Sequence, residues 1–245
     1  MMKHIITAVI VTAAAPAMAG ETVEYTSGDR QFEGYVAKAD SPRGAVVLIH
    51  DWDGLTDYEK KRADMLAEQG YNTFAIDLFG KGVRPETPEA NKAETEKLYA
   101  DREMMRRLMM AGLDAAAANE VTSPVVAGYC FGGAAALELA RLQPEGVTGY
   151  AIFHGGLETP EGQDYSAAKA PIRVYHGGAD ENPDMATFAA FLTELEQAGT
   201  PYLAEVYAGA PHAFTVFGSD RYREDADQKS WADFLIFLGE VNPGP

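Results

Sequence analysis

The chain has 245 residues, with 37 acidic and 20 basic side chains and a formal net charge of −17 at pH 7. That balance argues against nucleic acid or an anionic membrane surface as a partner. The length suits one sizeable α/β domain, and the single cysteine, Cys130, excludes an internal disulfide. A free thiol is prone to unwanted oxidation in an oxidising compartment, so it is expected to be either buried or functional. The single free thiol therefore favours a functional role for Cys130.

The segment 1–19 has the pattern of a secretory signal peptide. Lys3 gives a positive start, residues 5–15 are apolar, and the sequence AMA at 17–19 is a small-residue cleavage site. The apolar stretch is shorter than the ~20 residues that span a bilayer, and no apolar run follows it, which disfavours a membrane anchor. We therefore expect an exported protein, periplasmic in a bacterium or secreted. Its mature part is then one domain of residues 20–245, without stable membrane insertion.

Apolar runs bounded by Gly, Pro and Asp alternate with helical patterns along the mature chain. The predicted strands are residues 31–37, 45–49, 73–76, 125–128, 150–153, 172–175 and 204–207. The predicted helices are residues 58–69, 89–98, 103–118, 134–142, 184–198 and 225–238. Short strands that are apolar on both faces suit a buried parallel sheet. The pattern therefore predicts a three-layer α/β fold with a mostly parallel sheet flanked by helices.

Two connections carry further expectations. The sequence SPRG at 41–44 predicts that strands 31–37 and 45–49 form a hairpin at an antiparallel edge of the sheet. The Gly- and Pro-rich segment 80–89 has two interpretations: it shapes the mouth of a pocket, or it is an ordinary surface loop.

Cys130 lies in the segment 128–133, GYCFGG, between an apolar strand and an alanine-rich helix. Strand, G-x-C-x-G, helix is the context of a nucleophile elbow, here with sulfur in place of the serine oxygen. The glycines allow a strained, crowded turn, and the helix N-terminus favours the thiolate. The alternative is a small buried hydrophobe at a tight packing contact, which is less favoured because partners for the thiol follow in the expected order.

A thiol nucleophile needs a base, and the base needs an orienting acid. His50, His154 and His176 each end an apolar strand, where an imidazole is more often a structural group. His212 lies in a loop between the last strand and the last helix. In hydrolases of this architecture the order is nucleophile, acid, histidine, and only His212 leaves room for an acid between it and Cys130.

The acid candidate is Asp180, just past the strand 172–175, at the same sheet edge as the thiol and the imidazole. Two alternatives lie close to it in the sequence. Asp184 is more typical of a helix N-cap, and Glu181 would point the other way from Asp180 in an extended loop.

An acyl-transfer site also needs donors for the oxyanion. The N–H of Phe131, which follows the nucleophile, is one candidate, and the N–H of Trp52 in the loop after strand 45–49 is the other. His50, Asp51 and Asp53 in that loop resemble metal ligands, but no further cluster has ligand spacing. We therefore expect neither a metal nor another cofactor.

Five segments of the chain resemble the dienelactone hydrolase family of α/β-hydrolases and run in family order across nearly the whole mature part. They are LIHDWDG at 48–54, AIDLFG at 75–80, GYCFGG at 128–133, HGGAD at 176–180 and GAPHAF at 209–214. The resemblance implies an α/β-hydrolase fold and a Cys-His-Asp triad. It assigns Cys130 as nucleophile, His212 as base and Asp180 as acid, with Phe131 and Trp52 as oxyanion donors.

The chain departs from that family pattern at three positions. Dienelactone-cleaving members carry a glutamate at the position of Asp51, where it contacts the resting thiol, and aspartate is one methylene shorter. They hold the substrate carboxylate with two arginines, whose positions are occupied here by Lys81 and Val216. Possible substitutes, each more typical of a solvated surface charge, are Arg84, Arg221 and Arg223. The candidate thiol or substrate contacts are thus Asp51, Lys81 and Tyr129.

The resulting prediction is hydrolysis of a small-molecule carboxylic ester or lactone through a thioester intermediate. Four aromatic residues either line its pocket or belong to the core: Trp52, Phe79, Tyr129 and Phe214. Two alternatives stay open. One is a general carboxylesterase or thioesterase acting on cell-envelope or plant-derived esters. The other is a non-hydrolytic periplasmic thiol protein with a redox or ligand-binding role.

Overall fold

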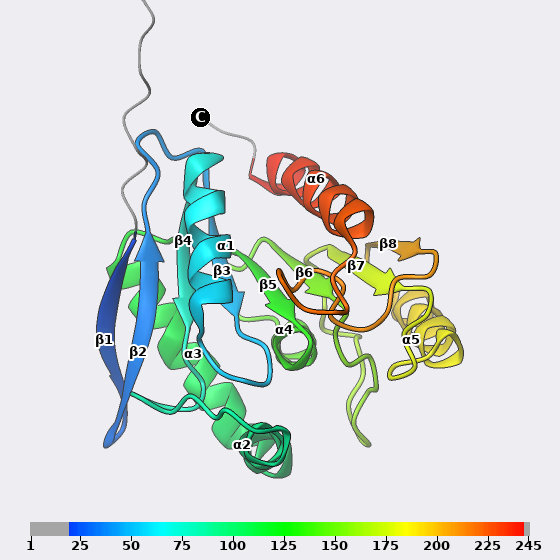
Figure 1. Ribbon diagram of the computed structural model, residues 1–245, viewed down its shortest axis with the longest axis horizontal. Helices are drawn as coiled ribbons and strands as arrows, with labels where there is room; N and C mark the ends of the chain where they lie inside the picture. Colours follow the sequence, from blue (N-terminus) through cyan, green and yellow to red (C-terminus); the bar gives the residue numbers. More distant parts are fainter. Residues whose placement is uncertain (1–19, 243–245) are drawn as a thin grey trace, which may run out of the picture.

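The computed structural model describes residues 20–242 and places them in a sheet of eight strands between two layers of helices (Figure 1). The predicted signal peptide, residues 1–19, lies outside the described residues. The strands are β1 (Glu21–Ser27), β2 (Arg30–Ala37), β3 (Gly44–Ile49), β4 (Tyr71–Ile76), β5 (Val125–Tyr129), β6 (Gly149–Phe153), β7 (Ile172–Gly177) and β8 (Tyr202–Tyr207). The helices are α1 (Asp57–Glu68), α2 (Pro88–Ala100), α3 (Arg102–Ala118), α4 (Phe131–Leu142), α5 (Met185–Ala198) and α6 (Glu224–Val241). The predicted three-layer α/β fold with a mostly parallel sheet is confirmed.

The spatial order of the strands is β1-β2-β4-β3-β5-β6-β7-β8. Strands β3 to β8 run parallel to one another, whereas β2 is antiparallel to both of its neighbours, β1 and β4. Helical crossovers between parallel strands place helices on both faces of the sheet, so the central strands have no face in contact with water.

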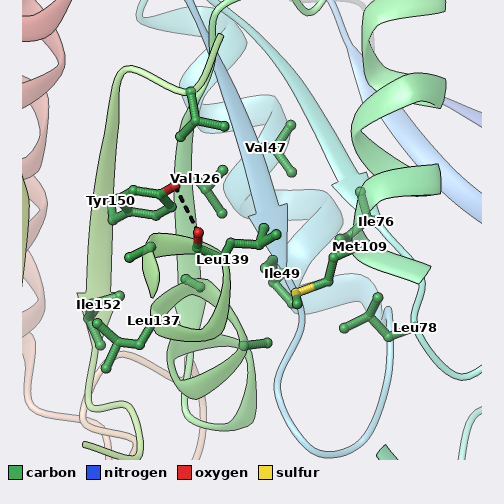
Figure 2. Packing of buried hydrophobic residues seen from close by; sticks show 14 of the residues in the cluster. Val47, Ile49, Ile76, Leu78, Met109, Val126, Leu137, Leu139, Tyr150 and Ile152 are labelled. Carbon is green, nitrogen blue, oxygen red and sulfur yellow. Dashed lines mark hydrogen bonds between the residues drawn. The ribbon is translucent and has the colours of Figure 1, made fainter. Parts of the chain in front are cut away.

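Alternate residues of the central strands build two separate cores. In β3, Val47 and Ile49 belong to the core that also contains side chains of α3, α4 and α5, whereas Val46 and Leu48 belong to the core with side chains of α1 and α6. Figure 2 shows the first core, where Met109 of α3 reaches the strand side chains. The period of two along each strand explains why the central strands are buried on both sides.

The predicted hairpin between residues 31–37 and 45–49 is wrong. β2 pairs instead with β1 and with β4, in the register Tyr35↔Ala75. The right-handed crossover through α1 places β4 beside β3, and β2 then pairs with the outer side of β4. The sequence analysis missed β1 because its residues are exposed or half-buried and largely polar, as suits an edge strand.

In the described part of the chain, no helix is long and apolar enough to cross a membrane.

Candidate active site

Cys130 follows β5 directly and is the N-cap residue of α4, with φ +50° and ψ −111°. A left-handed φ is strained for a residue with a side chain, so the surrounding packing must hold the turn. A Cβ on Gly128 would lie 2.0 Å from the carbonyl oxygen of Gly132, and one on Gly132 would lie 2.2 Å from that of Ile49. The glycines of the elbow are therefore required by close backbone approach, and together they project the thiol from the sheet edge.

The structure brings Cys130, His212 and Asp180 together. His212 Nε2 lies 3.0 Å from Cys130 Sγ, and His212 Nδ1 lies 2.8 Å from Asp180 Oδ2. Because a carboxylate only accepts, Nδ1 carries the proton and donates it, which leaves the lone pair of Nε2 facing the sulfur. The Asp180 side chain is completely buried, and its other oxygen accepts the N–H of Asn182 at 2.9 Å. The carboxylate is thus fixed in place and orients the imidazole.

The two alternative acids lie elsewhere. Asp184 is the N-cap of α5 and accepts the N–H of Thr187 at 2.8 Å, as its sequence context predicts. Glu181 is exposed to solvent. Asp180 is therefore the carboxylate that meets the histidine.

The remaining described histidines are buried structural groups. His50 Nε2 accepts the N–H of Leu78 at 3.1 Å, and His154 Nε2 pairs with the hydroxyl of Thr215 at 2.8 Å. Burial lowers the pKa of His50, of His154 and of His176, so all three rings are neutral near pH 7. Within residues 20–242, no three His, Cys, Asp or Glu side chains are grouped so as to hold a metal ion.

The Asp51 carboxyl group lies beside the thiol and binds a backbone amide. Its Oδ1 accepts the N–H of Trp52 at 2.5 Å, and the carboxyl group lines the cavity beside the thiol of Cys130. The shorter aspartate therefore lies close enough to the thiol to affect its pKa. Burial, followed by the charge of Asp51, raises the pKa of the Cys130 thiol well above its usual value. These effects outweigh the helix N-terminus, so the resting sulfur is a thiol and not the thiolate that the elbow alone favours.

Both predicted oxyanion donors lie beside the nucleophile. The Phe131 N–H belongs to the first residue of α4, where no earlier helical carbonyl accepts it. The Trp52 N–H is held by Asp51. The Phe131 N–H is therefore free to bind an oxyanion, whereas the Trp52 N–H becomes free only when the carboxylate of Asp51 moves away.

Glu59 fastens the loop that carries Trp52. Its completely buried carboxyl group accepts the N–H of Asp51 at 3.2 Å and the N–H of Thr56 at 2.9 Å, in a capping box at the start of α1. Burial, assisted by the charge of Asp53, raises the pKa of Glu59 to about 8. Glu59 is thus mainly protonated at neutral pH.

A cavity of about 710 Å³ opens over the thiol, and its lining includes Cys130, His212, Asp180, Asp51 and Trp52. The sequence analysis missed a second group of lining residues on α2, α3 and α4: Thr95, Tyr99, Arg102 and Arg141. The loop 80–89 does not line the cavity; the helix that follows it does. The missed residues look like ordinary polar positions of surface helices, and no local motif marks them.

Two of the predicted contact residues point away from the cavity. Lys81 is exposed and donates to Glu24 at 2.6 Å, on the outer side of β1. Tyr129 is completely buried and stacks on Phe153 at 4.8 Å, because successive residues of β5 point to opposite sides. Neither can contact a substrate in this arrangement.

The other residues proposed for the pocket divide in the same way. Phe79 and Phe214 belong to the core, whereas Trp52 lines the cavity. Arg84 donates a hydrogen bond to the carbonyl group of Leu55, and Arg223 donates to backbone carbonyl groups of its own turn. Of the three possible substitutes, only Arg221 lines the cavity, where it is exposed to solvent.

The arrangement can be compared with known proteins. The sequence matches the dienelactone hydrolase family over residues 32–242. The chain belongs to the dienelactone hydrolase family. It is 30% identical over 193 residues to a carboxymethylenebutenolidase of Rhodococcus opacus, with 73% of each chain covered. It is 29% identical over 206 residues to a probable 2-oxo-3-(5-oxofuran-2-ylidene)propanoate lactonase of Bradyrhizobium sp, with 79% of this chain and 82% of that one covered.

Solved structures agree with this assignment. A dienelactone hydrolase-like promiscuous phosphotriesterase from metagenomic libraries superimposes with a TM-score of 0.83 at 29% identity, over 92% of this chain and 99% of that one. The fold is that of the α/β-hydrolases, and membership of the family makes this dienelactone hydrolase-like protein a hydrolase acting on ester bonds.

Proposed function

We propose that this dienelactone hydrolase-like protein cleaves a small-molecule carboxylic ester or lactone through Cys130, His212 and Asp180, by way of a thioester intermediate. The observation that carries the proposal is the pair of short contacts of His212, 3.0 Å to the sulfur and 2.8 Å to the carboxylate. An unshared lone pair facing a thiol, with the other ring nitrogen held by a buried carboxylate, is the arrangement of a general base.

In the acylation step, His212 Nε2 takes the thiol proton as the sulfur attacks the carbonyl carbon. The new C–S bond shifts an electron pair to the carbonyl oxygen, which is stabilised by the N–H groups of Phe131 and Trp52. The substrate oxygen must displace the carboxylate of Asp51 from the Trp52 N–H. The thiol is therefore deprotonated in the presence of substrate and stays protected from oxidation at rest.

In the second half of the reaction, the imidazolium of His212 protonates the leaving alcohol as the C–O bond breaks. A lactone keeps that alcohol attached to the acyl group. Water, deprotonated by His212, then attacks the thioester and releases the thiol of Cys130 and the acid. Esters and lactones are favoured over amides, because the thiolate is a better leaving group than an amine anion and the tetrahedral adduct of an amide reverts.

The test compares Cys130→Ala with Cys130→Ser on 4-nitrophenyl acetate, with an acetyl adduct on the wild type sought by intact mass spectrometry. We expect the alanine variant to lose about 10³-fold or more in kcat/KM, and the wild type to show a transient acetyl thioester. Full activity in the alanine variant would contradict the proposal. A stable sulfenate without turnover would favour the non-hydrolytic thiol protein, and a library of esters, thioesters and lactones separates a general esterase from a lactonase.

We also propose that the protein is exported, on the basis of the signal-like pattern of residues 1–19. Expression of the full chain in a bacterium, followed by fractionation and N-terminal sequencing, tests this. The expected product is periplasmic and begins near Gly20 or Glu21. A full-length chain in the cytoplasm would overturn the proposal.

A further inference from the structure

His212 lies in a long segment without helix or strand, residues 208–223, between β8 and α6. Loops are the mobile parts of a fold, whereas a general base must be held within about 0.5 Å of its working position. Asp180 fixes one nitrogen of the ring, but a single hydrogen bond does not fix the segment that carries the ring. A further set of contacts must therefore hold this segment in place.

A buried ion pair behind the segment supplies part of this support. Arg62 of α1 is 1% exposed and pairs with Asp227 of α6, so the charge of the guanidinium is neutralised where water does not reach it. The same Nη2 atom of Arg62 also donates to the carbonyl oxygen of Thr215 at 2.9 Å. Thr215 is completely buried and follows closely after His212 in the sequence. The ion pair between α1 and α6 therefore fastens the main chain next to the base.

A chain of hydrogen bonds runs from Arg62 to a second histidine. Arg62 Nε donates to the hydroxyl oxygen of Tyr58 at 3.2 Å. The Tyr58 hydroxyl lies 2.6 Å from Thr215 Oγ1, and Thr215 Oγ1 lies 2.8 Å from His154 Nε2. His154 follows β6 directly and is buried, and its ring meets the ring of His212 edge-on, with 5.4 Å between the ring centres. The chain of hydrogen bonds therefore ends against the base.

The direction of these hydrogen bonds follows from Arg62, which can only donate. Tyr58 accepts from Arg62 and donates its own hydrogen to Thr215, and the hydrogen of Thr215 then goes to Nε2 of His154. In the reverse order, the hydrogen of Tyr58 would have no acceptor among residues 20–242. In that part of the chain, Nδ1 of His154 is buried without a partner in either order, so the first order leaves fewer polar groups unpaired. The first order places the proton of His154 on Nδ1.

This order keeps His154 neutral beside the base. The hydroxyl of Thr215 occupies the lone pair on Nε2, so a proton cannot bind there without breaking that hydrogen bond. Burial, followed by the charges of His212 and Arg62, also lowers the pKa of His154. A charged His154 would repel the imidazolium that His212 becomes during the reaction, whereas a neutral ring packs against it without that repulsion.

We propose, on the basis of the proposed function, that the members of this chain are positioning residues for the base: Arg62, Tyr58, Thr215 and His154. The ordered hydrogen bonds hold the main chain at Thr215 and place the neutral ring of His154 against the ring of His212. None of the four lines the cavity over the thiol, so they act through His212 and not on the substrate.

The first test removes one hydroxyl from the middle of the chain of hydrogen bonds. Thr215→Val keeps the shape of the side chain, and we expect kcat/KM for 4-nitrophenyl acetate to fall about tenfold. Thr215→Ser keeps the hydroxyl and should stay within about threefold of the wild type, whereas Tyr58→Phe interrupts the chain at another point and should resemble Thr215→Val. The control is Thr73→Val in β4, which removes a completely buried hydroxyl that donates to the carbonyl of Tyr71 at 3.0 Å, and it should leave kcat/KM unchanged.

The second test observes the imidazole rings directly and does not depend on turnover. With ¹⁵N-labelled histidine, NMR should show wild-type His154 as the tautomer with its proton on Nδ1. The signals are assigned by their loss in His154→Gln and in His212→Gln. The Nδ1 proton of His212, which Asp180 holds, should exchange slowly with water in the wild type and in Thr73→Val, and its signal should broaden in Thr215→Val.

Wild-type kcat/KM in Thr215→Val, or an equal loss in Thr215→Ser, overturns the proposal, because the hydroxyl then has no positioning role. A proton on Nε2 of His154 overturns it as well, because the hydrogen bonds then run in the other order. If Thr215→Val fails to fold, the same measurements on Tyr58→Phe decide.

Failure of the proposed function is recognised separately, because the wild type would then not hydrolyse the ester. In that case, a broadened Nδ1 proton signal of His212 in Thr215→Val supports the positioning role, and an unchanged signal overturns it.

Discussion

Glu59 is a buried carboxyl group that fastens the Trp52 loop to α1, and its ionisation should control how stability depends on pH. Its pKa rises from 4.5 to about 8 on folding, mainly through burial. Since the folded state holds the proton more tightly than the unfolded state, stability falls as pH rises between these two values. A pKa difference of one corresponds to about 1.4 kcal/mol, so the whole effect is at most about 5 kcal/mol, and most of it falls between pH 5 and pH 8.

The substitution Glu59→Gln keeps one acceptor oxygen, which can accept the N–H of either Asp51 or Thr56, and the side chain cannot ionise. Urea unfolding followed by circular dichroism between pH 5 and pH 9, at constant ionic strength, gives the free energy of unfolding of each protein. The difference in the free energy of unfolding between the variant and the wild type should grow in favour of the variant by up to about 4 kcal/mol from pH 5 to pH 8.

Comparison of the two proteins cancels the titration of the groups that do not interact with Glu59. The control is Glu68→Gln on the same helix, because Glu68 is exposed and should give a curve parallel to that of the wild type. Parallel curves for Glu59→Gln and the wild type would refute the reasoning, since they would mean that Glu59 ionises equally well in the folded and unfolded chains.

Three further predictions concern the site. Asp180→Asn removes the carboxylate that sets the tautomer of the base and should lower kcat by about 10²- to 10⁴-fold on 4-nitrophenyl acetate, whereas a loss below threefold would exclude its orienting role. Gly132→Ala places a Cβ 2.2 Å from the carbonyl oxygen of Ile49, so thermal unfolding should show a loss of several kcal/mol, about 3 or more, and an unchanged Tm would contradict the close approach. Asp51→Asn removes the charge that helps to raise the pKa of the Cys130 thiol, so the pH midpoint for alkylation by iodoacetamide should move to lower pH; an unmoved midpoint would leave burial as the sole cause.

Local features of the chain were predictable because their causes are local. The period of the apolar residues identifies the central strands and the helices, and the glycines around Cys130 identify a turn that tolerates no side chains. The order of Cys130, Asp180 and His212 follows from strand ends that share one edge of a parallel sheet. The structure brings these three side chains within hydrogen-bond distance, and their catalytic roles stay proposals.

The surroundings of the site were not predictable in the same way. Lys81 follows a family motif, yet it pairs with Glu24 of β1, a strand that the sequence pattern did not reveal. Arg102 carries no motif, yet the buried Glu138 of α4 holds it at the cavity that also contains the thiol. The direction of each of these side chains depends on a distant partner.

The sequence by itself therefore determined the class of fold, the strained turn at Cys130 and the order of three reactive side chains, because spacing and backbone sterics act over a few residues. The tertiary structure alone decided the pairing of β2 with β4, the position of Asp51 beside the thiol and the ion pair of Arg102 with Glu138. Those features depend on burial and on charges that are far apart along the chain. The burial of these groups and the proximity of these charges arise only when the helices pack on the sheet.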